Sequence, residues 1–319
     1  MSEDGSNGEE PVSRVLAVFV RHKMPLHESP TFQGLLQAFA SHPELQESLN
    51  VLIWDNSPAP LNNPEILPTF IYRHSPRNLG VSGAYNQAMK IAEAMGCQWL
   101  LLLDQDTAVT ADFLPRMVKL GCRFLHKPEI AAVVPFLMDG DFVLSPRKVL
   151  FKKFKPMDKP FEGIYPSEVT AANSGALMRI EALEQIGGFN EDFCLDFSDV
   201  VVFHLLHRRG KQVYIAGDLQ LMHKISVLDF ENSMTPERYA SFIAAEGAFW
   251  DIYRTGIERA FHTLRILERG IRQMRSLKTP AYSRITLGYF LKRLLLGKKQ
   301  RLSWWKLQSC QREIPRQGP

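Results

Sequence analysis

Short apolar runs alternate with helical patterns along the first half of the chain, and this alternation constrains the fold more than any other feature. Runs rich in aliphatic and β-branched residues predict buried strands at residues 14–20, 51–54, 70–72, 99–103 and 131–136. Apolar residues recur at helical spacing between them, over residues 31–41, 82–95 and 110–125. Strands separated by such helices predict an α/β fold, in which helices cover both faces of a mostly parallel sheet.

Polar residues follow several of the predicted strands. Asp55 follows the second strand, the loop 77–83 follows the third, and Asp104 and Asp106 follow the fourth. Ligands of parallel α/β sheets bind beyond the carboxyl ends of the strands. We therefore expect the functional site at this edge.

The chain divides into three predicted parts. Residues 1–13 are acidic and rich in Gly and Ser, which is typical of a disordered leader. Residues 14–235 form the predicted α/β domain, in which residues 139–165 are expected to be irregular. Residues 236–319 form a predicted amphipathic, basic helical extension. No window of about 18 apolar residues is present, so we expect no membrane-spanning helix.

Charge is distributed unevenly along the sequence. The 319 residues carry a net charge of +4, but residues 254–319 hold 16 Lys and Arg against 3 Glu, so the remainder is near −9. Basic residues mixed with Leu, Phe and Trp are typical of helices that lie at a membrane interface. The extension could equally pack on the α/β domain with a solvated basic face. Four scattered cysteines fit free thiols in a reducing compartment, so we expect a cytoplasmic protein on the inner face of the cell membrane.

Several common site motifs are absent from the sequence. It contains neither the P-loop Gly-x-x-x-x-Gly-Lys-Ser/Thr nor the Gly-x-Gly-x-x-Gly turn, which disfavours P-loop ATPases and ordinary dinucleotide dehydrogenases. It also lacks His-Glu-x-x-His and Gly-x-Ser-x-Gly. No recognised nucleic-acid module accompanies the basic charge, so nucleic-acid binding is not expected.

Asp104-Gln105-Asp106 is the most informative short segment. Two carboxylates separated by one residue can hold Mg²⁺ or Mn²⁺ and leave coordination positions open for phosphate oxygens. The alternative is a turn in which an Asp caps the next helix.

Ordered sequence blocks resemble glycosyltransferase family 2, which has the Rossmann-like GT-A fold of nucleotide-diphospho-sugar transferases. These blocks are residues 78–86 (NLGVSGAYN), 101–106 (LLLDQD), 172–177 (ANSGAL), 187–191 (GGFNE), 196–199 (DFSD) and 221–224 (LMHK). The Asp-Gln-Asp form resembles the rhamnosyltransferase branch in particular. The resemblance covers residues 14–226, and the domain 14–235 is accordingly expected to be catalytic.

The resemblance implies roles on the donor side of the site. Asp55 would contact the nucleotide base or ribose, although a strand-end turn Asp is about as common. Asp104 would face the ribose and the metal. The other residues implied to lie beside the nucleotide are Arg77, Asn78, Gly80 and Gly83. Asn173 and Ser174 would line the acceptor and sugar side, although they could simply form a polar strand end.

The resemblance also implies metal ligands and a catalytic base. Asp106 would bind the cation directly, with Asp104, and His223 would make a late metal or diphosphate contact, although a lone His is more often structural. Asp199 matches the general base that takes the proton of the acceptor hydroxyl, although it could also cap a helix over residues 200–209. Asp196 could contact the acceptor sugar or cap the same turn.

The sequence departs from the family pattern at two places. Residues 200–205 lack the acidic residue and the Arg that commonly follow the base, which leaves acceptor contacts open. The first strand ends in Arg21-His22-Lys23, which we expect to be solvated loop residues slightly more than diphosphate contacts.

The sequence therefore predicts a metal-dependent, inverting glycosyltransferase. Its donor would be a nucleotide-diphosphate sugar, with dTDP-L-rhamnose first and a UDP-hexose second. Its acceptor would be a sugar of a surface polysaccharide or a lipid-linked glycan. A nucleotidyltransferase is an alternative, but the Gly-rich basic loop expected after its first strand is absent. An inert nucleotide- or membrane-binding domain is another, and the intact acidic residues argue against it.

Overall fold

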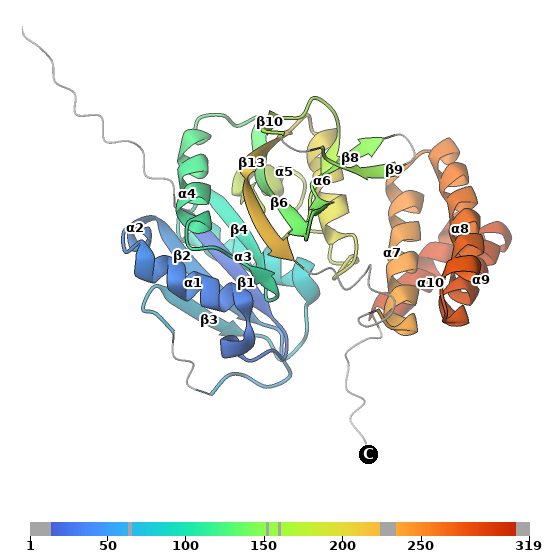
Figure 1. Ribbon diagram of the computed structural model, residues 1–319, viewed down its shortest axis with the longest axis horizontal. Coiled ribbons are helices and arrows are strands. Elements are labelled where there is room, and N and C mark those ends of the chain that lie inside the picture. Colours follow the sequence, from blue (N-terminus) through green and yellow to red (C-terminus); the bar gives the residue numbers. More distant parts are fainter. Residues whose placement is uncertain (1–13, 63–65, 151–152, 159–160, 224–233, 311–319) are drawn as a thin grey trace, which may run out of the picture.

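The computed structural model describes residues 14–62, 66–150, 153–158, 161–223 and 234–310. A central β-sheet is flanked by helices, and four further helices, α7 to α10, lie together at one end of the molecule (Figure 1). The predicted α/β fold with a largely parallel sheet is confirmed.

The main sheet is mostly parallel, as the alternation of strands and helices predicts. Strands β1–β2, β1–β4, β2–β3 and β6–β13 pair in parallel, whereas β12 is antiparallel to both β4 and β6. The order along the sheet is β10 (Gly163–Ile164), β13 (Gln212–His223), β6 (Ile130–Asp139), β12 (Leu177–Arg179), β4 (Trp99–Asp104), β1 (Val15–Arg21), β2 (Leu49–Asp55) and β3 (Phe70–His74), with β5 (Thr107–Ala108) on β13 and β7 (Phe142–Ser145) on β6.

Hydrophobic cores lie on both faces of this sheet. Alternate side chains of a strand point to opposite faces, so Val15 and Phe19 of β1 enter one core while Leu16 and Val18 enter the other. Burial on both faces explains why the strands read as continuous apolar runs. The helices and the 3-10 turn of this part are η1 (Leu26–Glu28), α1 (Pro30–Ser41), α2 (Leu45–Ser48), α3 (Gly80–Ala94), α4 (Phe113–Arg123), α5 (Ile180–Gln185) and α6 (Ser198–Arg208).

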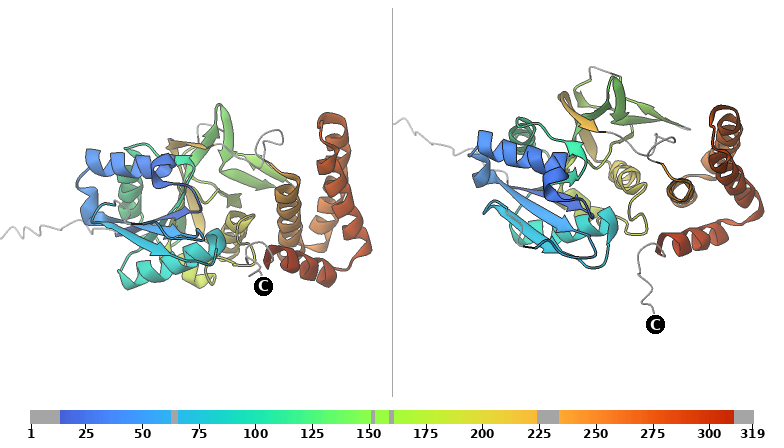
Figure 2. Two further views of the ribbon diagram at one scale, coloured as in Figure 1. Left: turned by 90° about the horizontal axis from the view of Figure 1, so that it is seen from below. Right: turned by 60° about the horizontal axis from the view of Figure 1, so that its bottom comes forward.

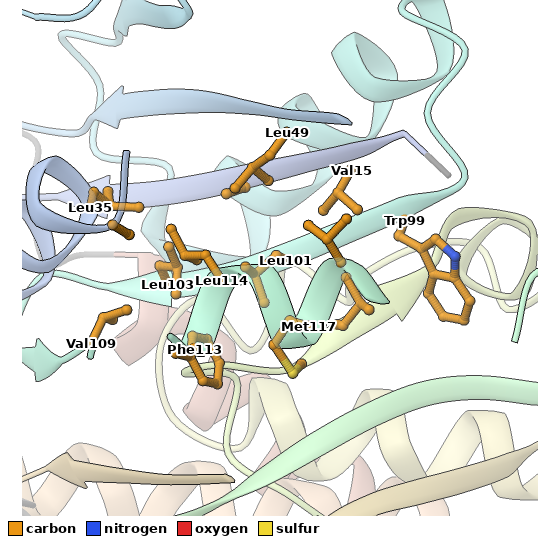
Figure 3. Packing of buried hydrophobic residues seen from close by; sticks show 14 of the residues in the cluster. Val15, Leu35, Leu49, Trp99, Leu101, Leu103, Val109, Phe113, Leu114 and Met117 are labelled. Atoms are coloured by element: carbon orange, nitrogen blue, oxygen red, sulfur yellow. The ribbon is translucent and has the colours of Figure 1, made fainter. Parts of the chain in front are cut away.

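Helix α4 shows how a helix covers the sheet. Phe113, Leu114 and Met117 of α4 lie against Leu101 and Leu103 of β4 in the same core (Figure 3). All five side chains are at most 1% exposed. The amphipathic pattern predicted for residues 110–125 therefore corresponds to a helix that buries one face on the sheet.

The prediction that residues 139–165 are irregular is wrong in its described part. Besides β7 and β10, this segment contains β8 (Arg147–Leu150) and β9 (Lys153–Pro156), which form a small antiparallel sheet with β11 (Val169–Thr170) in the order β11-β8-β9. These strands are short, β9 is largely exposed and β8 is only half-buried. They consequently lack the apolar period on which strand prediction depends.

The C-terminal helices begin at clear capping signals. Thr235 accepts a hydrogen bond from Arg238 N, and Thr255 forms a capping box with Glu258. The helices are α7 (Pro236–Tyr253), α8 (Gly256–Ser276), α9 (Pro280–Leu295) and α10 (Lys298–Cys310). Within the described part of the chain, no helix is both long and apolar enough to cross a bilayer.

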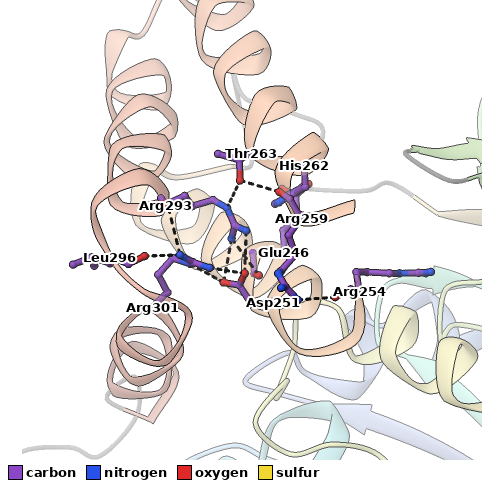
Figure 4. A network of polar contacts seen from close by, with 10 residues as sticks. Glu246, Asp251, Arg254, Arg259, His262, Thr263, Arg293, Leu296 and Arg301 are labelled. Atoms are coloured by element: carbon purple, nitrogen blue, oxygen red, sulfur yellow. Dashed lines mark hydrogen bonds and ion pairs between the residues drawn. The ribbon is translucent and has the colours of Figure 1, made fainter. Parts of the chain in front are cut away.

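Part of the basic charge of these helices is neutralised inside the bundle. Asp251 of α7 accepts hydrogen bonds from Arg293 (3.0 Å) and Arg301 (2.8 Å), as Figure 4 shows. Glu246 pairs with Arg269 at 2.7 and 2.8 Å. Both carboxylates are buried. A buried ion pair needs such multiple hydrogen bonds to offset desolvation, so these arginines have a structural role.

Helix α7 lies between the α/β part and the helices α8 and α9 (Figures 1 and 2). Arg254 pairs with Glu168, beside β11, at 2.7 Å. Tyr253 Oη accepts a hydrogen bond from Asn190 at 3.0 Å. The helical extension is thus packed on the α/β part, as the second interpretation of its charge proposed.

Candidate active site

The parallel register places the predicted polar residues in one row at the carboxyl edge of the sheet. Arg21 of β1 lies opposite Asp55 of β2, and Val20 lies opposite Asp104 of β4. His223 ends β13, which pairs with β5 immediately after the Asp104 turn. The fold therefore gathers residues from both ends of the α/β part, from Arg21 to His223.

Asp55 is fully buried and held by several donors. Its carboxylate accepts hydrogen bonds from Tyr72 Oη (2.6 Å) and Ser57 N (2.9 Å), and it forms an ion pair with Arg21. Burial raises the pKa of Asp55, but these hydrogen bonds and the Arg21 charge outweigh it, so the pKa is lowered. A carboxylate has about four lone-pair sites. Tyr72, Ser57 and Arg21 already bind the Asp55 carboxylate, so a nucleotide would have to use a remaining site.

The expectation that Arg21 is a solvated loop residue is wrong. Arg21 is 4% exposed, because its guanidinium neutralises the buried Asp55. The next residue also has a structural contact, since His22 N donates to Gln105 Oε1 at 2.8 Å. The end of the first strand is thereby tied to the Asp-Gln-Asp turn.

The start of helix α1 fixes the Asp-Gln-Asp turn. Thr31 Oγ1 donates to the carbonyl oxygens of Asp104 and Thr107, and Ser29 Oγ donates to the carbonyl of Gln105 at 2.6 Å. Neither acidic residue of the turn caps the next helix, which begins at Phe113. The capping interpretation of this motif therefore does not hold.

A hydrogen-bonded chain connects the side chains of this turn with β13. Ser174 Oγ donates to Asp104 Oδ2 at 2.7 Å and lies 2.8 Å from Thr107 Oγ1. Thr107 Oγ1 in turn lies 2.9 Å from His223 Nδ1. On the other carboxylate oxygen, Tyr85 Oη donates to Asp104 Oδ1 at 3.1 Å.

The same side chains form an acidic cluster. Asp106 Oδ1 lies 3.7 Å from His223 Nδ1. Burial raises the pKa of Asp106 and Asp104 repels its charge, while His223 acts in the opposite direction. Burial, together with Asp104, Asp199 and Asp106, also raises the pKa of Tyr85 well above its usual value.

These residues fit a hard divalent cation. Mg²⁺ and Mn²⁺ bound to a diphosphate take one or two protein carboxylates and keep other positions for phosphate and water. Asp106 is suited to this because its side chain is 55% exposed beside the more enclosed His223. The described residues contain no group of three or more His, Cys, Asp or Glu arranged around a metal position. The fit to a cation therefore depends on the carboxylates of Asp104 and Asp106, of which Asp106 is open to solvent.

Asp199 lies in the first turn of α6. Its Oδ1 accepts a hydrogen bond from Val200 N at 2.7 Å. Burial raises the pKa of Asp199 to about 6, with further repulsion from Asp104 and Asp196. The residue before the helix, Phe197, has a left-handed backbone with φ of 63°. Such strain costs of order 1–3 kcal/mol and persists only where packing enforces it.

Asp196 has a partner that the sequence did not reveal. Arg238 of α7 binds its carboxylate through both guanidinium nitrogens, with Nη2 to Oδ1 at 2.6 Å. The Asp196 side chain is 9% exposed. This ion pair ties the loop before the base helix to the C-terminal bundle.

The remaining residues predicted to line the site differ in their placement. The Arg77 side chain is exposed. Asn78 Oδ1 accepts from Gly80 N at 2.9 Å, which shapes the loop before α3. Asn173 is 9% exposed, and its Oδ1 has no hydrogen-bond partner in the described part of the chain. Gly83 lies within α3, where a Cβ would meet Leu79 Cβ at 2.7 Å.

Gly80→Ala is expected to destabilise the protein by more than Gly96→Ala. Both glycines have left-handed φ values, 66° and 69°, which cost another residue about 1–2 kcal/mol. Only at Gly80 would the new Cβ also collide, lying 2.8 Å from Cys194 Cβ and nearer still to its carbonyl. Overpacking of this kind adds about 1–3 kcal/mol. Equal losses of unfolding free energy in urea denaturation would contradict this steric argument.

Some residues of the cluster were missed at the sequence level. Tyr85 lies within the block 78–86, and Thr107 directly follows the block 101–106. Only a helical projection and the strand register could have indicated that their side chains reach the cluster. Thr31 stands at the start of a predicted helix and gave no sign of its contact with Asp104. Arg147, whose charge acts on Asp199, lies in the segment predicted to be irregular.

The comparisons with known proteins concern the family and the fold. Residues 32–187 match the family model described as Glycosyl transferase family 2. The comparison with curated proteins gave no sequence match. Together, the family match and the fold support a glycosyltransferase of the GT-A type.

Similar solved structures share the fold at low sequence identity. S. aureus TarS 1-349 has a TM-score of 0.54 at 14% identity and covers 93% of this chain and 88% of its own. Its structure in complex with UDP-GlcNAc has a TM-score of 0.51 at 15% identity, with the same coverage of 93% and 88%. GalNAc-T7 with UDP, GalNAc and Mn²⁺ has a TM-score of 0.52 at 12% identity, covering 89% of this chain and 56% of that chain. At these identities the likeness shows the GT-A fold alone.

Proposed function

We propose that this protein is a metal-dependent, inverting glycosyltransferase that uses a nucleotide-diphosphate sugar. The observation that carries the proposal is the cluster of Asp104, Asp106 and His223 at the carboxyl edge of the sheet. The Asp199 carboxylate lies close enough to this cluster for the negative charge of Asp104 to raise its pKa. A cation-binding pair beside a carboxylate of raised pKa supplies the two functions that direct sugar transfer needs.

Asp199 is the group we assign to the proton transfer. It would accept the proton of the acceptor hydroxyl as that oxygen attacks the anomeric carbon from the face opposite the diphosphate. With a pKa of about 6, the carboxylate is ionised at neutral pH and still basic enough to act as a general base. Attack from the opposite face inverts the anomeric configuration in one displacement.

Asp104 and Asp106 would hold the divalent cation, with His223 completing the site or contacting the diphosphate. A bound Mg²⁺ or Mn²⁺ would neutralise charge on the departing nucleoside diphosphate. Ser174 and Tyr85 fix the Asp104 carboxylate by hydrogen bonds to both of its oxygens. Asp55, Arg77 and Asn78 remain the proposed contacts to the nucleotide, and Asn173 the proposed contact on the acceptor and sugar side.

The donor is proposed to be dTDP-L-rhamnose, with a UDP-hexose as the second choice. The Asp-Gln-Asp resemblance favours the first, while the UDP complexes of the TarS and GalNAc-T7 structures favour a uridine nucleotide. A thermal-shift panel of nucleotide sugars with Mg²⁺ or Mn²⁺ tests the proposal, because a ligand that binds the native state raises its apparent stability. Stabilisation by nucleoside triphosphates alone, with release of pyrophosphate, would instead indicate a nucleotidyltransferase.

The acceptor is proposed to be a glycan on a lipid carrier, or a surface polysaccharide, reached at the inner face of the cell membrane. Helix α8 exposes Ile257 (66%), Leu264 (60%) and Ile271 (40%), which recur every seven residues and so lie along one side. Arg272 and Arg275 are exposed beside them. An apolar stripe edged by basic residues suits an anionic lipid surface.

Reversing the exposed charge should weaken lipid binding. The triple variant Arg272→Glu, Arg275→Glu, Lys278→Glu is expected to lose most binding to vesicles containing anionic lipid at low salt, because each basic residue near such a surface contributes about 1 kcal/mol. Vesicle sedimentation measures this. The matched control is Lys90→Glu with Lys119→Glu, which reverses exposed charges on the α/β part. Equal binding by the triple variant and wild type would refute the membrane role.

A further inference from the structure

Arg147 is an arginine without a carboxylate partner at the centre of the small sheet. It begins β8, the middle strand, where its Cα partners are Thr170 of β11 and Pro156 of β9. Its Nε donates to the carbonyl oxygen of Leu144 at 2.8 Å. Within the described part of the chain, no ion pair or other hydrogen bond of its side chain is present, which leaves both terminal nitrogens available.

Arg147 lies on the same side of the molecule as Asp199, with one strand between β8 and helix α6. Strand β11 lies beside β8 and contacts helix α6, which carries Asp199 in its first turn. Burial lowers the pKa of Arg147, while the Asp199 charge acts in the opposite direction. The two groups are nevertheless too far apart for an ion pair in the described structure. A partly buried guanidinium is costly to leave unpaired, so a further anion is expected beside it.

A second polar group in the same region lacks a partner. The segment that follows β11 runs beside the one that precedes β8, since Ala172 N donates to Ser145 Oγ at 2.8 Å. Asn173, the next residue, is nine-tenths buried, and its Oδ1 accepts no hydrogen bond from the described residues. A buried acceptor left unsatisfied is destabilising. A ligand that presents an anion to Arg147 and a hydroxyl donor to Asn173 Oδ1 would satisfy both groups.

We propose that Arg147 forms a subsite for an oxyanion, a phosphate or a carboxylate, carried by the acceptor substrate. The proposal rests on the proposed function and adds a chemical class to its acceptor. The guanidinium donates two parallel hydrogen bonds, which match the geometry of both oxyanions. With the anion held at Arg147, a hydroxyl of the same molecule would be directed toward Asp199.

The arrangement favours the acceptor over the donor diphosphate as the source of this anion. The proposed cation ligands Asp106 and His223 are placed by the turn after β4 and by the end of β13. Arg147 instead belongs to the small sheet that packs on α6, beside the base. An anion at Arg147 would therefore lie on the base side of the site.

Anion binding by the full-length protein tests the subsite. Inorganic phosphate and acetate are titrated by calorimetry at constant ionic strength with EDTA present. We expect Arg147→Gln to weaken binding of the better anion about tenfold, because hydrogen bonds to charged groups contribute about 1.5–3 kcal/mol, and Arg147→Lys to weaken it less. Lys148→Gln is the matched control, because Lys148 is adjacent in sequence but pairs with Asp158. Affinity within twofold of wild type in Arg147→Gln, or no binding of either anion to wild type, would overturn the proposal.

A second titration separates the acceptor from the donor. The affinities of UDP and dTDP in the presence of Mn²⁺ should be the same in Arg147→Gln and wild type. A parallel loss of nucleotide affinity would place Arg147 at the donor diphosphate and overturn the acceptor assignment. If wild type bound neither nucleotide, the proposed function would fail, while the anion titration would still decide whether the subsite exists. Melting temperatures of the variants confirm that they are folded.

Discussion

Asp199→Asn should abolish sugar transfer while leaving donor binding nearly unchanged. The substitution keeps the size of the side chain and an oxygen that can accept the hydrogen bond from Val200 N, but it removes the basic carboxylate. Loss of a positioned general base typically costs about 10² to 10⁴ in rate. Transfer is measured with the donor identified in the nucleotide-sugar panel, and donor affinity is measured with the same divalent cation.

The matched control for this variant is Asp192→Asn. Asp192 lies in the same loop before α6, but its carboxylate pairs with Lys306 of α10 at 2.6 Å. Asp192→Asn should therefore retain transfer activity. Full activity of Asp199→Asn would refute the base assignment, and loss of donor binding together with activity would show that Asp199 acts mainly on the donor.

The pH dependence of transfer should report the same carboxylate. Burial raises the pKa of Asp199 to about 6, and a general base acts only in its deprotonated form. Transfer should consequently fall as the pH decreases through about 6, or through a lower value when a bound cation adds positive charge nearby. This acidic limb of the pH profile is expected in kcat/KM of the wild-type protein. Its persistence in residual Asp199→Asn activity would assign it to another group.

The fold was predictable from sequence where a strand or helix is buried in the usual way. The segment containing Val15 and Phe19 is apolar on both faces because both faces of β1 are covered, and such runs are readable without a structure. The strands β8 and β9 were missed because they are short and have no fully buried residue. Their stability comes from pairing with each other and with β11, which depends on contacts that no local pattern records.

The proposed site was predictable only in part, and for a related reason. Asp104, Asp106 and Asp55 follow apolar strands, so the general rule for parallel sheets places them at one edge. The contacts that fix them come from distant elements. Thr31 of α1 donates to the carbonyl oxygen of Asp104, and Ser174, which precedes β12, donates to the Asp104 carboxylate. Arg21 of β1 forms the ion pair with Asp55. A single sequence gives the acidic groups but not the donors that orient them.

Asp106→Ala should remove cation-dependent nucleotide binding. Asp106 is the more exposed carboxylate of the proposed cation pair. Ser174 and Tyr85 donate hydrogen bonds to Asp104, whereas no side chain among the described residues donates one to Asp106. Even outer partners of metal ligands cost about 10- to 100-fold in metal affinity when removed. We therefore expect the Mn²⁺-dependent gain in UDP or dTDP affinity to fall by about 100-fold or more, as measured by calorimetry with and without Mn²⁺.

The stability of this variant separates a ligand role from a structural one. Asp104 repels the Asp106 charge and burial disfavours it, so removing that charge should not lower the melting temperature in EDTA. Asp112→Ala is the matched control, because Asp112 is 83% exposed and follows the same turn; it should retain Mn²⁺-dependent binding. Unchanged Mn²⁺-dependent affinity in Asp106→Ala would contradict the ligand assignment. A lower melting temperature in EDTA would show that Asp106 is kept for folding, since a group that only binds the cation contributes nothing to stability without it.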